Sequence, residues 1–575
     1  MHPQPYYITT PIYYVNDRPH IGHCYTTTVA DVAARMHRLL GRDVYFLTGT
    51  DEHADKVVAA AHEHQMTPQQ WADRCSGEFR RAFERLELSP DVFYRTSDPH
   101  HKRLAGEYIG ALKERGDIYL GDYVGWYDVS QDEYLTETVA KEAEYKSPVT
   151  GKPLEKRTEK NYFFRLSKYA EALQKRIEAN PGFILPEARR NEVLGRLRGG
   201  LQDVPVSRAI RAGDADWGEW GVRMPGDPEH RVYVWIEALC NYLSAVDRDD
   251  PGAGAGLRGD AAGHADRGDL RRYWPASVHV MAKDILWFHA VVWPAMLMAL
   301  GRGLPGTVYA HAYYVRDGRK MSKSLGNFIE IDLLEKYCER YSPDAVRWYL
   351  ATQGPLGATD ADFSHAHFVE TFNADLANGI GNCASRVGNM VAKYFDGRVP
   401  EAGGRFAFDA RSEQQTHASF NWAELTPVIL STYESAMHGF ALSEALRVAM
   451  RYASDVDQFI NATRPFGLAK GIEKGTSADP EGDRATLAAV LYCCAEAVRI
   501  ASLMLFPACP SKMAALWRTW GCSVLNDPHD IDSGFVAPLA ELAKWAGPYG
   551  LKAGQAVSKG GILFMRADPA EEPPK

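Results

Sequence analysis

Two histidines stand three residues apart near the start of the chain, in the stretch NDRPHIGHCY at residues 16–25. YYITTPIYY before it predicts a strand, and CYTTTVADVAARMHRLLG predicts a helix. The unpaired N–H groups of a helix start attract anions, and Gly22 lets a ligand approach the backbone closely. His20 and His23 would share one face of the first turn and could donate hydrogen bonds to phosphates. The alternative is that one histidine caps the helix and the other lies on the surface.

A second candidate is the basic stretch RDGRKMSKSLGN at residues 316–327, which follows a predicted strand. Its Arg319, Lys320 and Lys323 lie in a polar loop flanked by glycine. Lysines in such a loop can close over a triphosphate and neutralise a departing pyrophosphate. Alone, the stretch is more typical of a solvated basic turn. Because it accompanies the two histidines, it favours a nucleotide site.

A βαβ unit must position these residues. Val29, Val32, Ala33 and Met36 recur on one helical face, and the apolar run RDVYFLTG that follows is typical of a covered parallel strand. Apolar strand texture returns in three later stretches, RVYVWIEAL, ASVHVMAKDILWFHAVVWPAML and GTVYAHAYYV. We therefore expect a split, doubly wound, Rossmann-like parallel sheet.

The rest of the chain divides into segments of different composition and hydrophobic pattern. Residues 116–228 are polar and punctuated by turns, which predicts an inserted domain with short strands. Residues 251–270 predict a flexible surface loop, and the final RADPAEEPPK predicts a disordered tail. From about residue 370, apolar residues recur at helical spacing, which predicts a C-terminal antiparallel helical bundle with polar loops near 400–420 and 470–484.

Composition excludes several classes of protein. The 575 residues are too many for one core, and 45% hydrophobic with 24% charged residues is ordinary for a globular protein. A net charge of −9 gives no overall basic field, so a nucleic-acid partner would need a local basic face. Nine cysteines occur without a C-x-x-C pair, which argues against a zinc knuckle or redox motif. We see no secretory signal or membrane-length apolar stretch and expect a cytoplasmic protein.

HIGH at residues 20–23 and KMSKS at residues 320–324, in this order on a split βαβ chain, resemble the two signatures of class I aminoacyl-tRNA synthetases. TTPIYYVNDRPHIGH, FLTGTDEH, VYVWIEALCNYL and KDILWFHAVVWPAML further resemble blocks of the methionyl-tRNA synthetases, and the resemblance covers nearly the whole chain. It implies ATP-dependent ligation of L-methionine to tRNA(Met), initiator tRNA included, through a methionyl-adenylate. It also implies that Mg²⁺ accompanies ATP and that AMP and pyrophosphate are released.

The resemblance implies a role for each site residue. The catalytic residues would be His20, His23, Lys320 and Lys323, all acting on phosphates. The ATP site would comprise His20, Gly22, His23, Lys283, Asp284, Lys320, Met321, Ser322, Lys323 and Ser324. The methionine pocket would comprise Ile12, Tyr14, Asp51, Trp235, Ala238, Leu239, Tyr242, Ile285, His289 and Trp293, with Asp51 on the α-ammonium. A thioether suits aromatic walls, and Asp51 ends a strand, where ligands of α/β sheets bind. Without the resemblance, core packing is the simpler role for the two tryptophans.

The bundle carries the tRNA part of the resemblance. NCASR resembles the family's anticodon-reading helix through Asn382 and Arg386, and RPFGLAK resembles a second anticodon segment through Pro465 and Phe466. The family usually has Trp where this chain has Phe466. A phenyl ring can still stack on a base, with less area. The alternative for Phe466 is packing at a helix end.

Two departures from the family lead to further expectations. Many relatives carry Cys-rich zinc knuckles in the inserted domain, but residues 116–228 hold no cysteine, so we expect one zinc-free knuckle. No additional tRNA-binding domain follows the bundle, so we expect a monomer.

The expected domains are catalytic halves 1–115 and 229–319, connective insertion 116–228, KMSKS loop and stem-contact region 320–369, helical anticodon-binding domain 370–550 and tail 551–575.

Four alternatives fit parts of the pattern. Synthetases for leucine, isoleucine and valine carry a large editing insertion, for which the 300 residues between His20 and Lys320 leave little room. The cysteine enzyme needs zinc ligands that this chain lacks. A small-molecule nucleotidyltransferase with an H-x-G-H signature would lack the bundle. A non-catalytic tRNA-binding relative would have lost HIGH or KMSKS, and both are intact.

Overall fold

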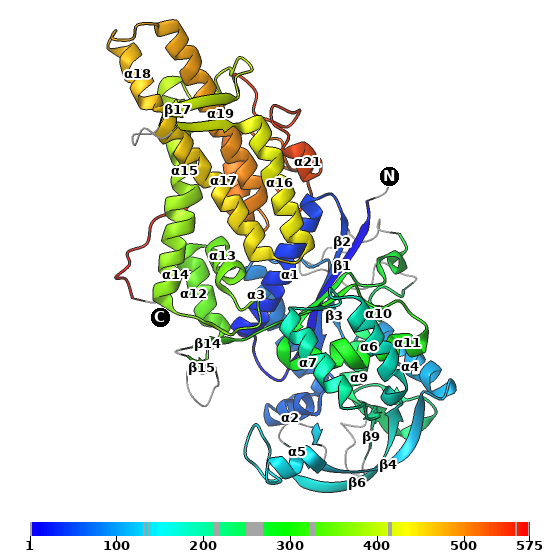
Figure 1. Cartoon of the computed structure of the whole chain (residues 1–575). Helices are drawn as coiled ribbons and strands as arrows, with labels where there is room; N and C mark the ends of the chain where they lie inside the picture. Colours follow the sequence, from blue (N-terminus) through cyan, green and yellow to red (C-terminus); the bar gives the residue numbers. More distant parts are fainter. Residues whose placement is uncertain are drawn as a thin grey trace.

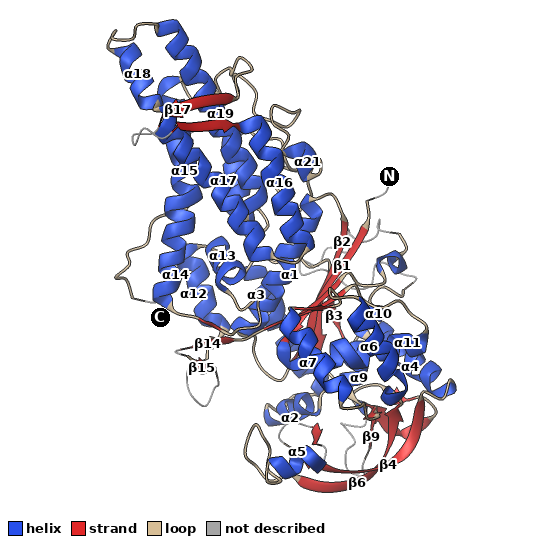
Figure 2. Ribbon diagram, viewed as in Figure 1, coloured by secondary structure: helices blue, strands red, loops and turns tan. Residues whose placement is uncertain are grey.

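A parallel six-stranded sheet lies at the centre of the molecule, between a helical bundle and a smaller antiparallel sheet (Figure 1). The computed structural model describes residues 3–129, 133–135, 137–210, 219–248, 268–316, 318–321, 328–411, 417–557, 561–572 and 574. The predicted flexible loop 251–270 lies mostly outside these residues. Figure 2 shows the strands of the central sheet running behind the helices that cover them.

The central sheet is built from both catalytic halves of the chain and one short strand between them. Its strand order is β3-β2-β1-β12-β13-β7, with every neighbouring pair parallel. The order reverses between β1 and β12, and doubly wound sheets bind ligands at such a point. The predicted split sheet is confirmed, with an edge strand, β7, that comes from within the predicted insertion. The strands are β1 (Pro5–Tyr14), β2 (Asp43–Asp51), β3 (Val92–Arg95), β7 (Ile184–Leu185), β12 (Val278–Ala282) and β13 (Thr307–His311).

Helix α1 (Ile21–Leu39) is buried along almost its whole length. It carries Asp31 and Arg35 inside the core, with Oδ2 of Asp31 2.9 Å from Arg35 Nε and 2.7 Å from Arg347 Nη2. Buried charges are tolerated when paired, and Arg347 also donates to the carbonyl oxygen of Pro507 at 2.6 Å. These contacts fix α1 to the bundle. The other helices of the first half are α2 (Asp55–Glu63), α3 (Pro68–Arg85) and α4 (Pro99–Glu114).

The inserted segment forms two small antiparallel sheets, β5-β4-β6-β8 and β10-β11-β9, followed or flanked by short helices. The strands are β4 (Ile118–Asp128), β5 (Glu133–Leu135), β6 (Glu155–Phe164), β8 (Val204–Pro205), β9 (Ser207–Ala209), β10 (Arg223–Met224) and β11 (Asp227–Val232). The helices are α5 (Glu137–Glu142), η1 (Leu166–Tyr169), α6 (Ala170–Ala179) and α7 (Glu187–Arg198).

One predicted strand is wrong after its first two residues. RVYVWIEAL leaves β11 after Val232 and continues as α9 (Val234–Leu239) and α10 (Asn241–Ser244). A short apolar run has the same pattern in a buried strand and a buried helix, so periodicity alone does not separate them. In the same way, the long apolar stretch after β12 is helical, as η4 (Lys283–Ile285), η5 (Phe288–Val292) and α11 (Trp293–Leu300).

The C-terminal half is the expected helical bundle. The predicted polar loop near 400–420 is wrong in part, because β17 (Ala407–Arg411) and β18 (His417–Asn421) form an antiparallel hairpin there. Among the described residues, one helix, α19 (Pro480–Leu505), is long and apolar enough to span a membrane, and its most apolar stretch is entirely buried. The helices are α12 (Ile331–Tyr341), α13 (Pro343–Gln353), α14 (His365–Thr371), η7 (Phe372–Gly381), α15 (Asn382–Tyr394), α16 (Trp422–His438), α17 (Leu442–Thr463), α18 (Pro465–Glu473), α19 (Pro480–Leu505), α20 (Pro510–Trp520) and α21 (Leu539–Leu542).

The prediction of a disordered tail is wrong for its described residues. Glu571 lies 2.6 Å from Arg340 and accepts a hydrogen bond from Tyr341. Asn373 exchanges two hydrogen bonds with the backbone of Ala567, at 3.0 and 2.9 Å. The partners lie about 200 residues earlier in the sequence, so tail composition alone gives no sign of them.

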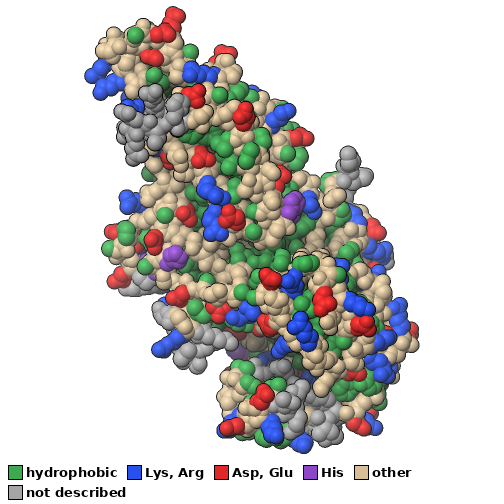
Figure 3. All heavy atoms as spheres, viewed as in Figure 1, with side chains coloured by type: hydrophobic (Ala, Val, Ile, Leu, Met, Phe, Trp, Pro, Cys, Tyr) green, Lys and Arg blue, Asp and Glu red, His purple; other side chains and the backbone are tan. Residues whose placement is uncertain are grey.

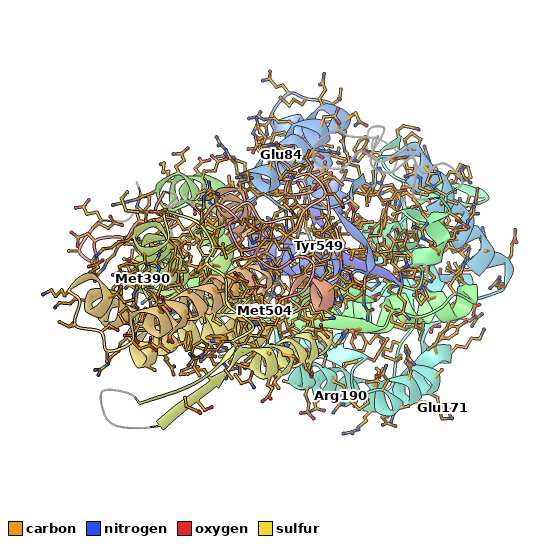
Figure 4. The ribbon with its side chains drawn as sticks, turned by 90° about the horizontal axis from the view of Figure 1, so that it is seen from above. Glu84, Glu171, Arg190, Met390, Met504 and Tyr549 are labelled. Carbon is orange, nitrogen blue, oxygen red and sulfur yellow. The ribbon has the colours of Figure 1, made fainter. Side chains whose placement is uncertain are left out.

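The bundle and the helices of the inserted segment lie on opposite sides of the molecule. From above, Met390 and Met504 lie among the bundle helices, whereas Glu171 and Arg190 lie on α6 and α7 at the opposite side (Figure 4). On the face seen in Figure 3, acidic and basic side chains are interspersed. That distribution agrees with the small net charge and gives this face no single sign.

Candidate active site

A cavity of about 450 Å³ opens where β1, β2, β12 and β13 end, beside the start of α1. Thirteen of the predicted site residues line it, although they come from four separate stretches of sequence. They are Ile12, Tyr14, His20, Gly22, His23, Asp51, Trp235, Ala238, Leu239, Tyr242, Asp284, Ile285 and His289. The cavity therefore brings the predicted nucleotide and amino-acid groups together at the reversal of the strand order.

His20 both caps α1 and lines the cavity. Its Nδ1 accepts a hydrogen bond from the Gly22 N–H at 3.0 Å, and Nδ1 of His23 accepts from the His20 N–H at 3.3 Å. The rings stack with centroids 3.7 Å apart. Because each Nδ1 is an acceptor, each neutral ring carries its proton on Nε2 and can donate from there. The capping and ligand-binding interpretations of these histidines are thus compatible.

Burial keeps both imidazoles neutral. It lowers the pKa of His20 to about 4 and, together with the neighbouring His20, the pKa of His23 well below its usual value. Two neutral N–H donors add to the partial positive charge of the helix start. Gly22 is required for this arrangement, since a Cβ there would lie 2.9 Å from Cε1 of His20.

Asp51 presents an unsatisfied carboxylate oxygen at the end of β2. The residue is buried, lines the cavity, and has no hydrogen-bond partner for Oδ1 among the described residues. Burial, and then the nearby negative charge of Glu237, raise the pKa of Asp51 well above its usual value. A cationic group would relieve both effects. The carboxylate therefore suits a small ammonium ligand.

Glu237 is itself fixed by two histidines behind the cavity. Its carboxylate lies 3.0 Å from Nδ1 of His53 and 2.7 Å from Nε2 of His101. Burial opposes ionisation of Glu237, but these two partners outweigh it and hold its pKa at about 2. The negative charge that acts on Asp51 is therefore permanent at neutral pH.

Aromatic rings form the apolar wall. Trp235 stacks on Phe288 with centroids 4.4 Å apart, and Tyr14 meets Trp235 edge to face at 5.8 Å. The Tyr242 hydroxyl lies 2.8 Å from Nε2 of His289, whose Nδ1 lies 2.9 Å from the Ile285 carbonyl oxygen. A carbonyl accepts only, so His289 donates from Nδ1 and accepts from Tyr242 at Nε2. Burial lowers the pKa of His289 to about 4, which keeps this tautomer neutral.

Some predicted residues lie elsewhere. Lys283 does not line the cavity and forms an ion pair with Asp360 at 2.7 Å. Trp293 lies fully buried behind Tyr242, with ring centroids 6.3 Å apart. Met321 packs partly buried against the core. Three motif residues, Ser322, Lys323 and Ser324, and the side chain of Lys320 lie outside what the structure describes.

The predicted anticodon residues lie on the bundle. Asn382 and Phe466 are exposed, Phe466 by 49%, and Pro465 is buried at the start of α18. Arg386 forms an ion pair with Asp457 of α17. The exposure of Phe466 argues against the alternative that it packs in the core.

Comparison with known proteins agrees with this geometry. The family model "tRNA synthetases class I (M)" matches residues 6–143 and 141–388. A methionine–tRNA ligase of Thermotoga maritima is 39% identical over 515 residues, 89% of this chain and 75% of the relative. The ligase of Streptomyces coelicolor is 37% identical, with 98% and 97% covered. The chain belongs to the methionyl-tRNA synthetases.

A solved structure of the family extends the match to the whole fold. Mycobacterium tuberculosis methionyl-tRNA synthetase in complex with methionyl-adenylate matches with a TM-score of 0.80 at 34% identity, covering 98% of this chain and 100% of that one. The free form of the same synthetase matches with a TM-score of 0.75. The resemblance drawn from HIGH and KMSKS is confirmed.

Sequence reasoning missed several lining residues. Phe288 stands three residues after Ile285 in a block already assigned to the methionyl-tRNA synthetases, so helical spacing could have found it. His311 ends β13, but it stands in the middle of the predicted strand GTVYAHAYYV, so the sequence did not place it at a strand end. Arg18 and Phe328 gave no signal, because their place at the cavity depends on contacts between distant segments.

Proposed function

We propose that the chain activates L-methionine with ATP in this cavity and transfers it to tRNA(Met), releasing AMP and pyrophosphate. Its family and the adenylate-bound relative support methionine activation and tRNA charging. The observation that carries the proposal is one cavity lined both by the unsatisfied oxygen of Asp51 and by the imidazole pair at the start of α1. The first suits an α-ammonium and the second suits phosphates.

Activation needs the methionine carboxylate to attack the α-phosphate in line, so positioning and charge stabilisation carry most of the rate. In this proposal Asp51 orients the ammonium, and Nε2–H of His20 and His23 donates to phosphate oxygens as their charge grows. Lys320 and Lys323 neutralise the departing pyrophosphate, and Asp284 faces the nucleotide. Burial and the neighbouring Asp284 raise the pKa of Tyr313 well above its usual value.

Selectivity for methionine follows from the wall of the cavity. A flexible, polarisable thioether makes favourable contacts with aromatic rings, and Trp235 and Phe288 supply a stacked pair. The hydrogen-bonded Tyr242 and His289 would close the far end. Trp293 supports Tyr242 from behind, so we assign it a role in the shape of the pocket.

Transfer would use the bundle to select the tRNA. We propose that Asn382, Arg386, Pro465 and Phe466 bind the anticodon, with a base stacked on the exposed ring of Phe466. tRNA and ATP are the substrates, so we place the reaction in the cytoplasm. We also propose a monomer, which sedimentation velocity would test.

We propose Mg²⁺ with ATP and no zinc. The turn at residues 145–154 supports a knuckle held without metal, because the Ser147 hydroxyl accepts from the Val149 and Thr150 N–H groups at 3.3 and 3.1 Å. The rings of Trp126 and Tyr145 also pack at 4.4 Å. Stoichiometric zinc in the purified protein, measured by elemental analysis, would contradict this.

Aminoacylation tests the proposed function. Purified protein should attach labelled methionine to tRNA(Met) only when ATP is present. The same protein should leave a tRNA for another amino acid uncharged. Attachment that needs no ATP, or equal charging of both tRNAs, would contradict the proposal.

A further inference from the structure

Arg18 joins three elements around the start of α1. Its guanidinium donates to both carboxylate oxygens of Asp332, at 3.0 and 2.7 Å, and its Nε donates to Glu78 at 2.9 Å. Asp332 lies in the first turn of α12, and Glu78 lies on α3. A two-pronged arginine–carboxylate pair fixes direction as well as distance. Arg18 therefore holds α12 and α3 in one orientation.

Backbone contacts beside these ion pairs also join the start of α1 to the segment before α12. The Ile21 N–H donates to the Ile329 carbonyl oxygen at 3.1 Å, and His20 forms an isolated antiparallel bridge with Glu330. The ring of Phe328 meets the ring of His20 edge to face at 4.8 Å. Residues 328–332 therefore lie against the first turn of α1, where the histidines line the cavity.

We propose that Arg18 is a positioning residue for methionine activation, which keeps residues 328–332 and α3 in register with His20 and His23. The inference rests on the proposed function, because it takes the two histidines as phosphate ligands. Arg18 also lines the cavity, and the role proposed for it acts through the backbone beside it. The proposed positioning depends on three residues of this chain, Arg18, Glu78 and Asp332.

Exposure decides what kind of effect to expect. The side chains of Arg18 and Asp332 are 47% and 54% exposed, and exposed ion pairs contribute little to stability. Small displacements of reacting groups, in contrast, can cost about 100-fold in rate. Loss of Arg18 should therefore lower the rate of activation and leave the unfolding temperature almost unchanged.

Kinetics of methionine-dependent ATP–pyrophosphate exchange provide the first test. Arg18→Ala and Asp332→Ala should each lower kcat about 10-fold with little change in KM for ATP. The double variant should be no slower than Arg18→Ala alone, because Arg18→Ala already removes the contact with Asp332. Arg18→Lys should lose part of the rate, since an ammonium cannot form the two-pronged pair.

A matched control lies on the same two helices. Arg85 of α3 and Glu335 of α12 form a looser exposed pair, with Nε and Oε1 3.9 Å apart. Arg85→Ala should leave kcat unchanged. A rise in KM for ATP in Arg18→Ala, with no loss of kcat in Asp332→Ala, would instead make Arg18 a direct phosphate ligand and overturn the proposal. Additive losses in the double variant would also overturn it.

Amide hydrogen exchange of the protein without ligands separates this inference from the proposed function. Arg18→Ala should speed exchange in peptides covering residues 19–24 and 328–334, and Arg85→Ala should not. Unchanged exchange in both peptides would overturn the positioning role whether or not the protein activates methionine. Faster exchange in a protein whose wild type shows no methionine-dependent reaction would support the positioning contact and count against the proposed function alone.

Discussion

At the scale of single residues, methionine activation would depend on Asp51 and the two stacked histidines. Strand ends and HIGH identified these residues from the sequence, because each stands at a junction where α/β sheets bind ligands. Their protonation could not be predicted in the same way. It follows from burial and from which backbone N–H each ring accepts, and both depend on packing between distant segments.

Asp51→Asn should weaken methionine binding about 10- to 150-fold, since hydrogen bonds to charged groups contribute about 1.5–3 kcal/mol. The folded state favours the protonated form of Asp51, because its pKa is raised by burial and by Glu237. Ionisation at neutral pH therefore costs stability, and Asp51→Asn should unfold at no lower temperature than wild type.

The same shift predicts a pH dependence. Methionine binding to the wild type should weaken as pH falls through the raised pKa of Asp51, above the range of an ordinary carboxyl group. Binding to Asp51→Asn should show no such change. Calorimetric titration of methionine into both proteins across pH measures this, and parallel curves would contradict the ammonium-binding role.

His20→Ala should slow adenylate formation about 100-fold or more, as expected for loss of a transition-state donor, with little change in methionine affinity. Since burial lowers the pKa of His20 to about 4, the wild-type rate should show no titration of this residue between pH 6 and 8. Single-turnover rates across that range provide the measurement. If the main effect of His20→Ala were on methionine affinity, the assigned role would be wrong.

At the scale of elements, the start of α1 does two tasks that conflict in an ordinary helix. The side chain of His20 caps the N-terminus of α1, yet the same ring must also lie in the cavity beside Gly22. The helix itself was predictable from its apolar face. The sharp change from β11 into α9 was not, because a short buried apolar run fits a strand and a helix equally well.

Gly22→Ala should therefore lower the rate of activation without loss of stability. A Cβ would lie 2.9 Å from Cε1 of His20 and displace the ring, whereas alanine is otherwise favoured in a helix. Gly77→Ala in α3 is the matched control, because a Cβ there meets nothing within 4 Å among the described residues. Gly77→Ala should keep full activity and gain up to about 1 kcal/mol of stability. Equal activity in both variants would contradict the packing argument.

At the scale of the whole molecule, the catalytic sheet and the bundle are joined by a buried charge network. Arg347 of α13 contacts Asp31 of α1 and the carbonyl oxygen of Pro507. Composition and periodicity predicted the two bodies but not this junction, or the tail contacts of Glu571, since both pair residues far apart in sequence. The sheet should nevertheless activate methionine independently of the bundle, and the bundle should act only in tRNA charging.

Phe466→Ala tests that separation. Stacking of one base on an aromatic ring contributes about 1–3 kcal/mol, so kcat/KM for tRNA charging should fall about 5- to 150-fold. Methionine activation without tRNA should be unaffected, and Phe466→Trp should charge tRNA normally. Because the ring is 49% exposed, the unfolding temperature of Phe466→Ala should change little. A destabilised variant whose folded fraction charges tRNA normally would leave Phe466 with a packing role only.

ATP–pyrophosphate exchange with each of the twenty amino acids at equal concentration tests whether this cavity selects methionine. Methionine should drive exchange most strongly, about 10-fold or more above leucine and isoleucine, the discrimination that a shaped apolar pocket provides. The Asp51→Asn variant should lose most of that exchange. Exchange driven by leucine or isoleucine as strongly as by methionine would contradict the assignment of this cavity to methionine.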